Sequence, residues 1–210
     1  MEKIKILLVD DDYSWQSTMS RFLCKEEDMI VSGMVGSKKE AIDFIKSIKV
    51  NVILMDINLT ENNMDGIETA VEISQICESK IIMLTSIRRE DIIIDSFTAG
   101  AINFIYKDDY KQIPDLIRNV CKNSTPYEVL IKEYQKLKKE EQIKDLSRCE
   151  KEVYNLMEEN RTRRQIEDIL DKSENTVKKL IRQVLKKLKV KSSKEAVEKV
   201  NKLGIEKKTR

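Results

Sequence analysis

The sequence predicts an α/β domain with a doubly wound parallel sheet, followed by a small all-α domain of four helices that contains a helix-turn-helix. Three observations support this. Short apolar runs alternate with amphipathic segments over residues 1–122, no strand-like run follows Thr125, and charge divides between the halves. Residues 1–124 hold 15 basic and 21 acidic side chains, whereas residues 125–210 hold 24 and 16. The basic half indicates a nucleic-acid partner.

Five apolar runs have the length and the Ile, Val and Leu content of strands buried on both faces of a sheet. They are Ile4–Val9, Ile30–Val35, Val50–Met55, Ile81–Thr85 and Ala101–Tyr106. Segments with apolar residues three or four positions apart follow each run and predict helices. They are Ser14–Lys25, Lys38–Lys49, Asp65–Cys77, Glu90–Ala99 and Ile113–Lys122. Five βα units predict a flavodoxin-like five-stranded sheet, with its ligand site beyond the carboxyl ends of the strands.

The second half predicts helices only. A charged stretch, Tyr127–Lys144, has apolar residues at helical spacing (Leu130, Tyr134 and Leu137) and predicts a linker helix. The expected domains are residues 1–122, a linker at 123–144 and residues 145–210. Four helices are expected in the last domain, at Arg148–Glu159, Arg163–Leu170, Glu174–Leu188 and Lys194–Leu203.

Helix-start signals support three of these helices. Ser147 with Glu150, and Thr162 with Gln165, have the spacing of capping boxes. Ser173 is a third N-cap candidate, and the short turn before it suits a helix-turn-helix.

Composition excludes several classes of protein. No apolar run approaches the roughly 18 residues of a transmembrane helix, and the N-terminus does not have the pattern of a signal peptide, so we expect a cytoplasmic protein without membrane contact. The absence of histidine excludes Ser–His and Cys–His catalytic centres and His-ligated metals. The four cysteines are far apart and form no CxxC pair; we expect reduced thiols, most of them in the core.

Polar side chains follow four of the predicted strands. Asp10 and Asp11 come after the first strand, Asp56 after the third, Thr85 ends the fourth, and Lys107 follows the fifth. Clustered carboxylates need a cation, and Mg²⁺ suits a site with carboxylates, water and phosphate. A carboxylate in such a site can attack a phosphoryl group, and Asp56, alone at a central strand end, is the natural nucleophile. Lys107 and Thr85 are expected to stabilise the transferred group.

The order and spacing of these motifs resemble the receiver domain of two-component response regulators, over about residues 3–122. The resemblance also rests on Ser86 after Thr85 and on Ala99-Gly100-Ala101 before Phe104 and Lys107. It implies phosphorylation of Asp56 by a partner sensor histidine kinase. It further implies Mg²⁺ ligands at Asp10, Asp11, Asp56 and the backbone carbonyl of Asn58, switch residues Thr85 and Phe104, and a phosphoryl contact from Lys107.

The segment after Asp56 departs from the receiver pattern. Thr60 stands where receivers usually carry proline, and the loop to Gly66 is longer than usual. A regulator of the same architecture that works independently of phosphorylation therefore stays open, as does a plain core role for Phe104. A haloacid-dehalogenase-type phosphohydrolase is a weaker alternative, suggested by Asp10-x-Asp12, because it leaves Asp56 without a role.

The predicted helix Glu174–Leu188 has an apolar face and a basic face. Thr176 and the helix N-terminus can meet a phosphate, and Lys186 lies late in the helix, where a contact to the DNA backbone is expected. Basic residues outside the apolar face include Lys178, Lys179, Arg182 and Lys186.

Residues 145–205 resemble the LuxR-type helix-turn-helix of the NarL/FixJ response regulators. The matching motifs are Ser173-Glu174-x-Thr176-Val177-Lys178 and Lys187-Leu188, with Leu180 where most members carry His. The resemblance implies that Lys178, Lys179 and Arg182 face the DNA groove. It implies a non-enzymatic transcription regulator of promoter operators in double-stranded DNA, masked by its receiver and homodimeric when activated, with RNA polymerase as a further candidate partner.

Overall fold

The computed structural model describes residues 2–60, 64–122 and 126–202. The chain divides into two compact units, residues 1–135 and 136–210. The helix α6 (Pro126–Gln142) begins in the first unit and ends in the second. Expectations for Leu203 lie outside the described residues.

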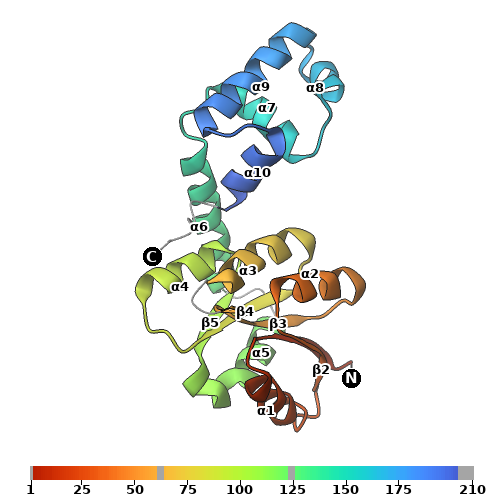
Figure 1. Ribbon diagram of the computed structural model, residues 1–210, viewed down its shortest axis with the longest axis vertical. Helices are drawn as coiled ribbons and strands as arrows, with labels where there is room; N and C mark the ends of the chain where they lie inside the picture. The colour runs from red at the N-terminus through yellow and green to blue at the C-terminus, as the bar shows by residue number, and fades with distance from the viewer. Residues whose placement is uncertain (1, 61–63, 123–125, 203–210) are drawn as a thin grey trace. The chain divides into compact units, whose positions relative to one another are not determined.

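The first unit alternates strands and helices as expected (Figure 1). Its strands are β1 (Ile4–Val9), β2 (Met29–Val35), β3 (Val52–Asp56), β4 (Lys80–Thr85) and β5 (Asn103–Tyr106). Its helices before α6 are α1 (Tyr13–Leu23), α2 (Lys38–Ser47), α3 (Asp65–Ile76), α4 (Glu90–Thr98), the 3₁₀ helix η1 (Lys107–Gln112) and α5 (Ile113–Lys122). The 3₁₀ turn at Lys107 was not expected from the sequence.

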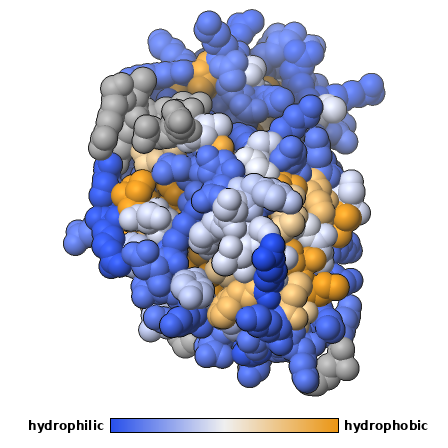
Figure 2. Space-filling view, turned by 60° about the horizontal axis from the view of Figure 1, so that its bottom comes forward, coloured by the Kyte–Doolittle hydropathy of each residue, from blue (hydrophilic) through white to orange (hydrophobic). Residues whose placement is uncertain are grey.

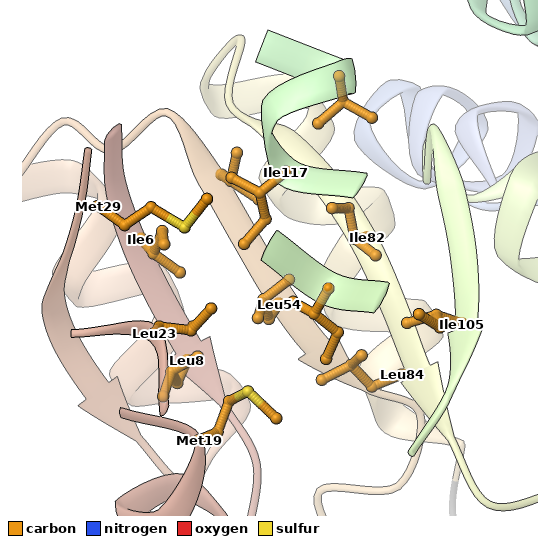
Figure 3. Close-up of a cluster of buried hydrophobic side chains, with 13 residues drawn as sticks. Ile6, Leu8, Met19, Leu23, Met29, Leu54, Ile82, Leu84, Ile105 and Ile117 are labelled. Carbon is orange, nitrogen blue, oxygen red and sulfur yellow. The ribbon is translucent and has the colours of Figure 1, made fainter. Parts of the chain in front are cut away.

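All neighbouring strands pair in parallel, in the order β2-β1-β3-β4-β5, which confirms the predicted flavodoxin-like sheet. Figure 1 shows α1 and α5 on one face of the sheet and α2, α3 and α4 on the other. Alternate strand residues point to opposite faces. Ile6 and Leu8 of β1 therefore pack with Met19 of α1 and Ile117 of α5 in one buried cluster (Figure 3).

Two expectations about burial are wrong. β2 is not buried on both faces, because it forms an edge of the sheet and Ile30 and Met34 are exposed. Most cysteines are not in the core: Cys24, Cys121 and Cys149 are exposed, since each lies at a helix end rather than on a core-facing stripe.

The second unit contains the four helices expected there. They are α7 (Arg148–Glu158), α8 (Arg163–Leu170), α9 (Glu174–Leu188) and α10 (Ser193–Asn201). Capping boxes form at Ser147 with Glu150 and at Thr162 with Gln165, as predicted. Val153 of α7, Ile166 of α8 and Val184 of α9 meet in one core cluster, so three helices support one another.

Hydrophilic side chains dominate the face shown in Figure 2, with apolar and weakly polar residues gathered toward its middle. This agrees with a charged fraction of 36%. Among the described residues, no helix is both long enough and apolar enough to span a membrane.

Candidate functional site

The sheet order brings the predicted site residues to one edge. β1 and β3 are neighbours, so Asp10, which follows β1, lies beside Asp56 at the end of β3. Thr85 ends β4, which pairs with β3 on one side and with β5 on the other. Lys107 directly follows β5. The carboxyl ends of parallel strands lie at the same edge of the sheet. Residues that directly follow neighbouring strands are therefore brought together by the strand order.

Lys107 links the two central carboxylates. Its Nζ lies 2.6 Å from Asp10 Oδ2 and 3.1 Å from Asp56 Oδ2. The ammonium also lies 4.9 Å from the centre of the Trp15 ring, the only tryptophan. The Asp10 side chain is fully buried, and that of Lys107 is 15% exposed. A cation in this position is shielded from water and acts strongly on the carboxylates.

Burial disfavours the charge of both carboxylates. It raises the pKa of Asp56 to about 6, against the opposing effect of Lys107 and with a further rise from Asp10. Burial likewise raises the pKa of Asp10, which Lys107 and the Asp12 backbone N–H counteract. Burial alone would lower the pKa of Lys107, but the hydrogen bond to Asp10 and the charge of Asp56 raise it overall. The site holds more negative charge than one lysine balances.

The acidic cluster fits a divalent cation. One carboxylate oxygen each from Asp10, Asp11 and Asp56 lies within 4.8 Å of the others. Asp11 is exposed, whereas Asp10 and Asp56 are buried, so the cluster opens to solvent on one side. Hard oxygen donors with room for water are the ligands that Mg²⁺ prefers. Asp12 has a different role: it is exposed, and its carboxylate caps α1 by accepting from the N–H groups of Ser14 and Trp15.

Gln16 is a site residue that sequence reasoning missed. Its side chain is 3% exposed, and its Nε2 donates to the backbone carbonyls of Asp10 at 2.6 Å and Val35 at 2.7 Å. It therefore ties the ends of β1 and β2 together under the acidic cluster. The available signal was a polar residue on the helix stripe that otherwise carries Met19 and Leu23.

Thr85 lies at the end of β4, and Phe104 lies on the neighbouring strand β5. Thr85 is 1% exposed, and its Oγ1 accepts from the Ile87 N–H at 3.0 Å. Phe104 is half-buried on β5 and makes an edge-to-face contact with Tyr106, with the ring centres 5.4 Å apart. The guanidinium of Arg88 stacks over the Tyr106 ring, with its Cζ 4.2 Å from the ring centre. The aromatic pair thus lies at the surface edge of the sheet.

The segment after Asp56 is held by short-range hydrogen bonds. The Asp65 carboxylate accepts from the Leu59 N–H at 2.8 Å and from the Thr60 hydroxyl at 2.9 Å. Asn58 Oδ1 accepts from the Met64 N–H at 3.3 Å, which leaves its backbone carbonyl outside this contact. Residues 61–63 of this loop lie outside the described residues.

The basic face of α9 has the exposure that contact with another molecule requires. Val177, Val184 and Leu188 are buried in the core of the second unit, as the apolar stripe predicts. The expected DNA-facing residues lie on other faces: Thr176, Lys179, Arg182 and Lys186 are exposed and Lys178 is half-buried.

Hydrogen bonds at the start of α9 engage two of these residues. Ser173 caps the helix by accepting from the Thr176 N–H, and the two hydroxyl oxygens lie 2.9 Å apart. Lys178 Nζ lies 2.6 Å from Glu174 Oε1, and Arg163 of α8 lies 3.5 Å from the same oxygen. Side-chain contacts therefore hold the first turn of α9 in place and link it to α8.

Lys187 holds α9 to α7, a role that sequence reasoning missed. Its Nζ lies 2.6 Å from Glu150 Oε2 and donates to the Asp145 carbonyl at 3.0 Å. The hydrogen bond from Lys187 lowers the pKa of the buried Glu150 carboxyl, which also caps α7 through the Ser147 N–H. The available signal was a lysine next to the buried Leu188, at the margin of the apolar stripe of α9.

Comparisons with known proteins identify both units. Residues 6–118 match the response regulator receiver domain, and residues 144–200 match the luxR family of bacterial regulatory proteins. The chain is 30% identical over 199 residues to the response regulator protein VraR of Staphylococcus aureus (strain NCTC 8325 / PS 47), covering 92% of this chain and 94% of the relative.

Solved structures share the fold. The response regulator domain of Thermotoga maritima CheB is 25% identical, with a TM-score of 0.54, over 59% of this chain and 100% of that chain. The response regulator RcsB of Salmonella typhimurium is 19% identical and shows the fold alone, with a TM-score of 0.52 over 94% of this chain and 97% of that chain. The chain belongs to the two-component response regulators of the NarL/LuxR type, with a receiver domain followed by a LuxR-type DNA-binding domain.

Proposed function

We propose that this response regulator is a cytoplasmic transcription regulator switched by phosphorylation of Asp56 by a partner sensor histidine kinase. The observation that supports this most directly is the position of Lys107 Nζ, 3.1 Å from Asp56 Oδ2 and 2.6 Å from Asp10 Oδ2. An ammonium there is placed to neutralise charge on a phosphoryl group bonded to Asp56.

In the proposed reaction, the ionised Asp56 carboxylate attacks the phosphorus of a phosphohistidine on the kinase. The O–P bond forms as the N–P bond breaks, and the imidazole nitrogen keeps the electron pair and takes up a proton. Asp10, Asp11, Asp56 and the backbone carbonyl of Asn58 would hold Mg²⁺, which supplies charge neutralisation for the transferred oxygens when bound. Lys107 orients the group and stabilises the product.

The switch would use the Thr85 hydroxyl and the Phe104 ring. Thr85 Oγ1 accepts from the Ile87 N–H, and a phosphoryl group on Asp56 would offer the Thr85 O–H a charged acceptor. Movement of Thr85 toward the phosphate would leave space that Phe104 fills, and Tyr106 would lose its edge-to-face partner. In this way, the charge added at Asp56 would change the surface formed by α4 and β5.

The second unit would bind double-stranded operator DNA at promoters through α9. Lys178, Lys179 and Arg182 lie in the first half of the helix, the part that a helix-turn-helix inserts into the major groove. Thr176 and Lys186 would contact phosphates. An activated homodimer would read an imperfect palindrome, and RNA polymerase is a further partner at such promoters. The functional boundaries that we propose are a receiver at 1–122, a linker at 123–144 and a DNA-binding domain at 145–210.

One observation favours a second candidate, a regulator of the same architecture that works independently of phosphorylation. The loop after Asp56 differs from the receiver pattern at Thr60, whose hydroxyl donates to Asp65. The chain as we propose it is not an enzyme. Steady turnover of a phosphate monoester by the full chain would instead favour the phosphohydrolase alternative.

Intact-mass measurement tests the proposal. Incubation with acetyl phosphate and Mg²⁺, or with a cognate kinase and ATP, is expected to add one phosphoryl group to the wild type and none to Asp56→Asn. Asp12→Asn is the matched control, because Asp12 is exposed and caps α1, and it should still be phosphorylated. If neither donor modifies the wild type, the phosphorylation-independent function replaces the first.

A further inference from the structure

The contact between Trp15 and Lys107 has no part in the proposed function. Trp15 lies in the first turn of α1, is half-buried and packs against the core cluster that contains Ile6 and Leu8. The centre of its ring lies 4.9 Å from Lys107 Nζ. An ammonium at this distance from an indole face is attracted by the ring electrons, and the attraction increases when the pair is shielded from water. The Lys107 side chain is shielded in this way, because it is only 15% exposed.

The acidic segment itself holds the ring beside the ammonium. Asp10 Oδ1 accepts from the Asp12 N–H at 2.9 Å, and Asp12 Oδ1 accepts from the Trp15 N–H at 3.0 Å. The other oxygen of Asp10, Oδ2, lies 2.6 Å from Lys107 Nζ. Together with the contact between the ring and the ammonium, these bonds form a closed circuit of four residues. The backbone of Trp15 is therefore fixed relative to the carboxylate that Lys107 contacts.

A cleft beside the site offers Lys107 a different position. The cleft has a volume of about 810 Å³, and its lining includes Trp15 and Phe22 of α1 and Lys107 and Tyr110 of η1. A lysine ammonium is strongly hydrated and is carried by a flexible chain of four carbons. In the cleft, the ammonium would regain water and leave the carboxylates. The position of Lys107 beside Asp56 therefore depends on the contacts that hold its ammonium there.

The carboxylate contacts of Lys107 are shared with other charges, whereas the ring contact is not. Asp10 and Asp56 are also proposed metal ligands, and a dication bound to them repels a neighbouring ammonium. Phosphorylation further engages an Asp56 oxygen in a bond to phosphorus. The neutral ring of Trp15 is not a ligand for Mg²⁺, which prefers oxygen donors, and it takes no part in the transfer. The ring contact is therefore kept while the carboxylate contacts weaken.

We propose that Trp15 is a positioning residue, whose ring keeps the Lys107 ammonium beside Asp10 and Asp56 when a metal ion or a phosphoryl group competes for these carboxylates. The inference deepens the proposed function, and it rests on phosphorylation of Asp56 only for the rate measurement below. Because the attraction comes from the ring electrons, phenylalanine should replace Trp15 in part and leucine should not.

The mobility of the Lys107 side chain tests this position directly. In the full chain with isotope-labelled lysine, the Lys107 ε-methylene resonance is identified by its loss in Lys107→Arg. With Mg²⁺ and no phosphodonor, nuclear magnetic relaxation should show this group restricted in the wild type, intermediate in Trp15→Phe and as mobile as exposed lysines in Trp15→Leu. A Lys107 side chain that is mobile in the wild type, or equally restricted in Trp15→Leu, would overturn the proposal.

Phe22→Leu is the matched control for the loss of an aromatic ring. Phe22 is half-buried on α1, lines the same cleft and makes an edge-to-face contact with Tyr110. Lys107 should stay restricted in this variant. Equal mobility of Lys107 in Phe22→Leu and Trp15→Leu would show a general effect of packing in α1 and would contradict the positioning role.

The rate of phosphorylation measures what the position of Lys107 contributes. With acetyl phosphate and Mg²⁺, intact-mass time courses should show Trp15→Leu labelled about tenfold more slowly than the wild type, the size expected for a cation–π contact shielded from water. Trp15→Phe should lie between them, and Phe22→Leu should be labelled at the wild-type rate. Labelling of Trp15→Leu at the wild-type rate, or equal slowing in Phe22→Leu, would overturn the inference.

The two measurements separate this inference from the proposed function. If the wild type accepts no phosphoryl group while the restriction of Lys107 depends on Trp15, the phosphorylation switch fails and the positioning role stands. If the wild type is phosphorylated while Lys107 is equally restricted in Trp15→Leu, only the inference fails. Circular dichroism checks the fold of each variant. If Trp15→Leu does not fold, the comparison of Trp15→Phe with the wild type decides, and identical mobility and rate in those two would overturn the inference.

Discussion

Burial and charge oppose each other at Asp56. The residue is 7% exposed, and burial outweighs Lys107 and raises its pKa to about 6. Because the pKa in the folded chain lies above the ordinary value of 3.8, the fold binds more protons than the unfolded chain between about pH 4 and pH 6. The free energy of unfolding is therefore expected to fall as the pH rises through this window.

The Asp56→Asn variant removes the unfavourable burial of the Asp56 charge. Without divalent cations, it should be more stable than the wild type at pH 7.5, by up to about 2–3 kcal/mol, with the difference shrinking toward pH 4.5. Addition of Mg²⁺ should stabilise the wild type more than the variant, because metal bound to the folded state adds stability. Urea titrations at both pH values, with EDTA and with Mg²⁺, provide the measurement. A difference independent of pH would show that Asp56 is not the group that titrates.

The buried Tyr154 hydroxyl lowers the stability of the second unit. The side chain is fully buried, and its oxygen has no hydrogen-bond partner among the described residues. A buried unpaired hydroxyl costs about 1–3 kcal/mol. Tyr154→Phe should therefore leave the free energy of unfolding unchanged or raise it by about 1 kcal/mol, whereas Tyr154→Leu, which also removes the ring packing, should lower it. Chemical denaturation distinguishes them, and a clear loss in the phenylalanine variant would reveal a partner for the hydroxyl.

At the scale of elements, the first turn of α3 lies very close to the end of β3, the strand that carries Asp56. A Cβ on Gly66 would lie 1.8 Å from the Asp56 carbonyl oxygen and 2.8 Å from that of Ile57, and the Gly66 N–H donates to Ile57 O at 2.9 Å. No side chain fits between this helix turn and the strand. The close approach positions the loop that joins the acceptor strand to α3.

Gly66→Ala should consequently destabilise the receiver by about 1–3 kcal/mol or more, since the atoms in the way belong to backbone. It should also slow phosphorylation, because the strand end must move. Gly36→Ala is the matched control: its Cβ would lie 3.7 Å from the nearest atom, an ordinary contact. Thermal unfolding and acetyl phosphate labelling of both variants decide the matter, and similar behaviour of the two would refute the steric argument.

Substitutions in α9 should distinguish residues that contact bases from residues that contact the DNA backbone. Arg182→Ala is expected to reduce binding to a specific duplex more than to a scrambled one, by about 1–3 kcal/mol of discrimination. Lys186→Ala should weaken both equally and reduce the slope of log affinity against log salt by about one. Titrations at several salt concentrations measure this. Equal losses on both duplexes for Arg182→Ala would assign that residue to the DNA backbone.

At the scale of the whole molecule, we predict that DNA binding by α9 is inhibited in the full chain until Asp56 is phosphorylated. Residues 136–210 form a compact unit whose core includes Ile143 and Leu146. This fragment should bind an operator duplex more tightly than the unphosphorylated full chain, and phosphorylation should remove most of the difference. Fluorescence anisotropy on one duplex compares the three species. A fragment that binds no better than the unphosphorylated chain would rule out masking.

Local sequence patterns by themselves predicted the strands, the α-helices and the strand-end position of three polar side chains. Period and strand-end position predicted the parallel sheet and the place of Asp10, Asp56 and Lys107, because parallel strands end at one edge. Capping residues such as Ser147 and Thr162 predicted helix starts, since a cap bonds within its own first turn. These features depend on neighbours within a few residues.

Tertiary structure decided whatever depends on residues distant in the chain. Gln16 reaches the Val35 carbonyl, Lys187 reaches Glu150, and Gly66 meets the Asp56 carbonyl only because separate elements pack together. The edge position of β2 exposes side chains whose apolar run predicted burial on both faces. The raised pKa of Asp56 follows from the same cause, because desolvation depends on how many elements close around a side chain and not on its neighbours in sequence.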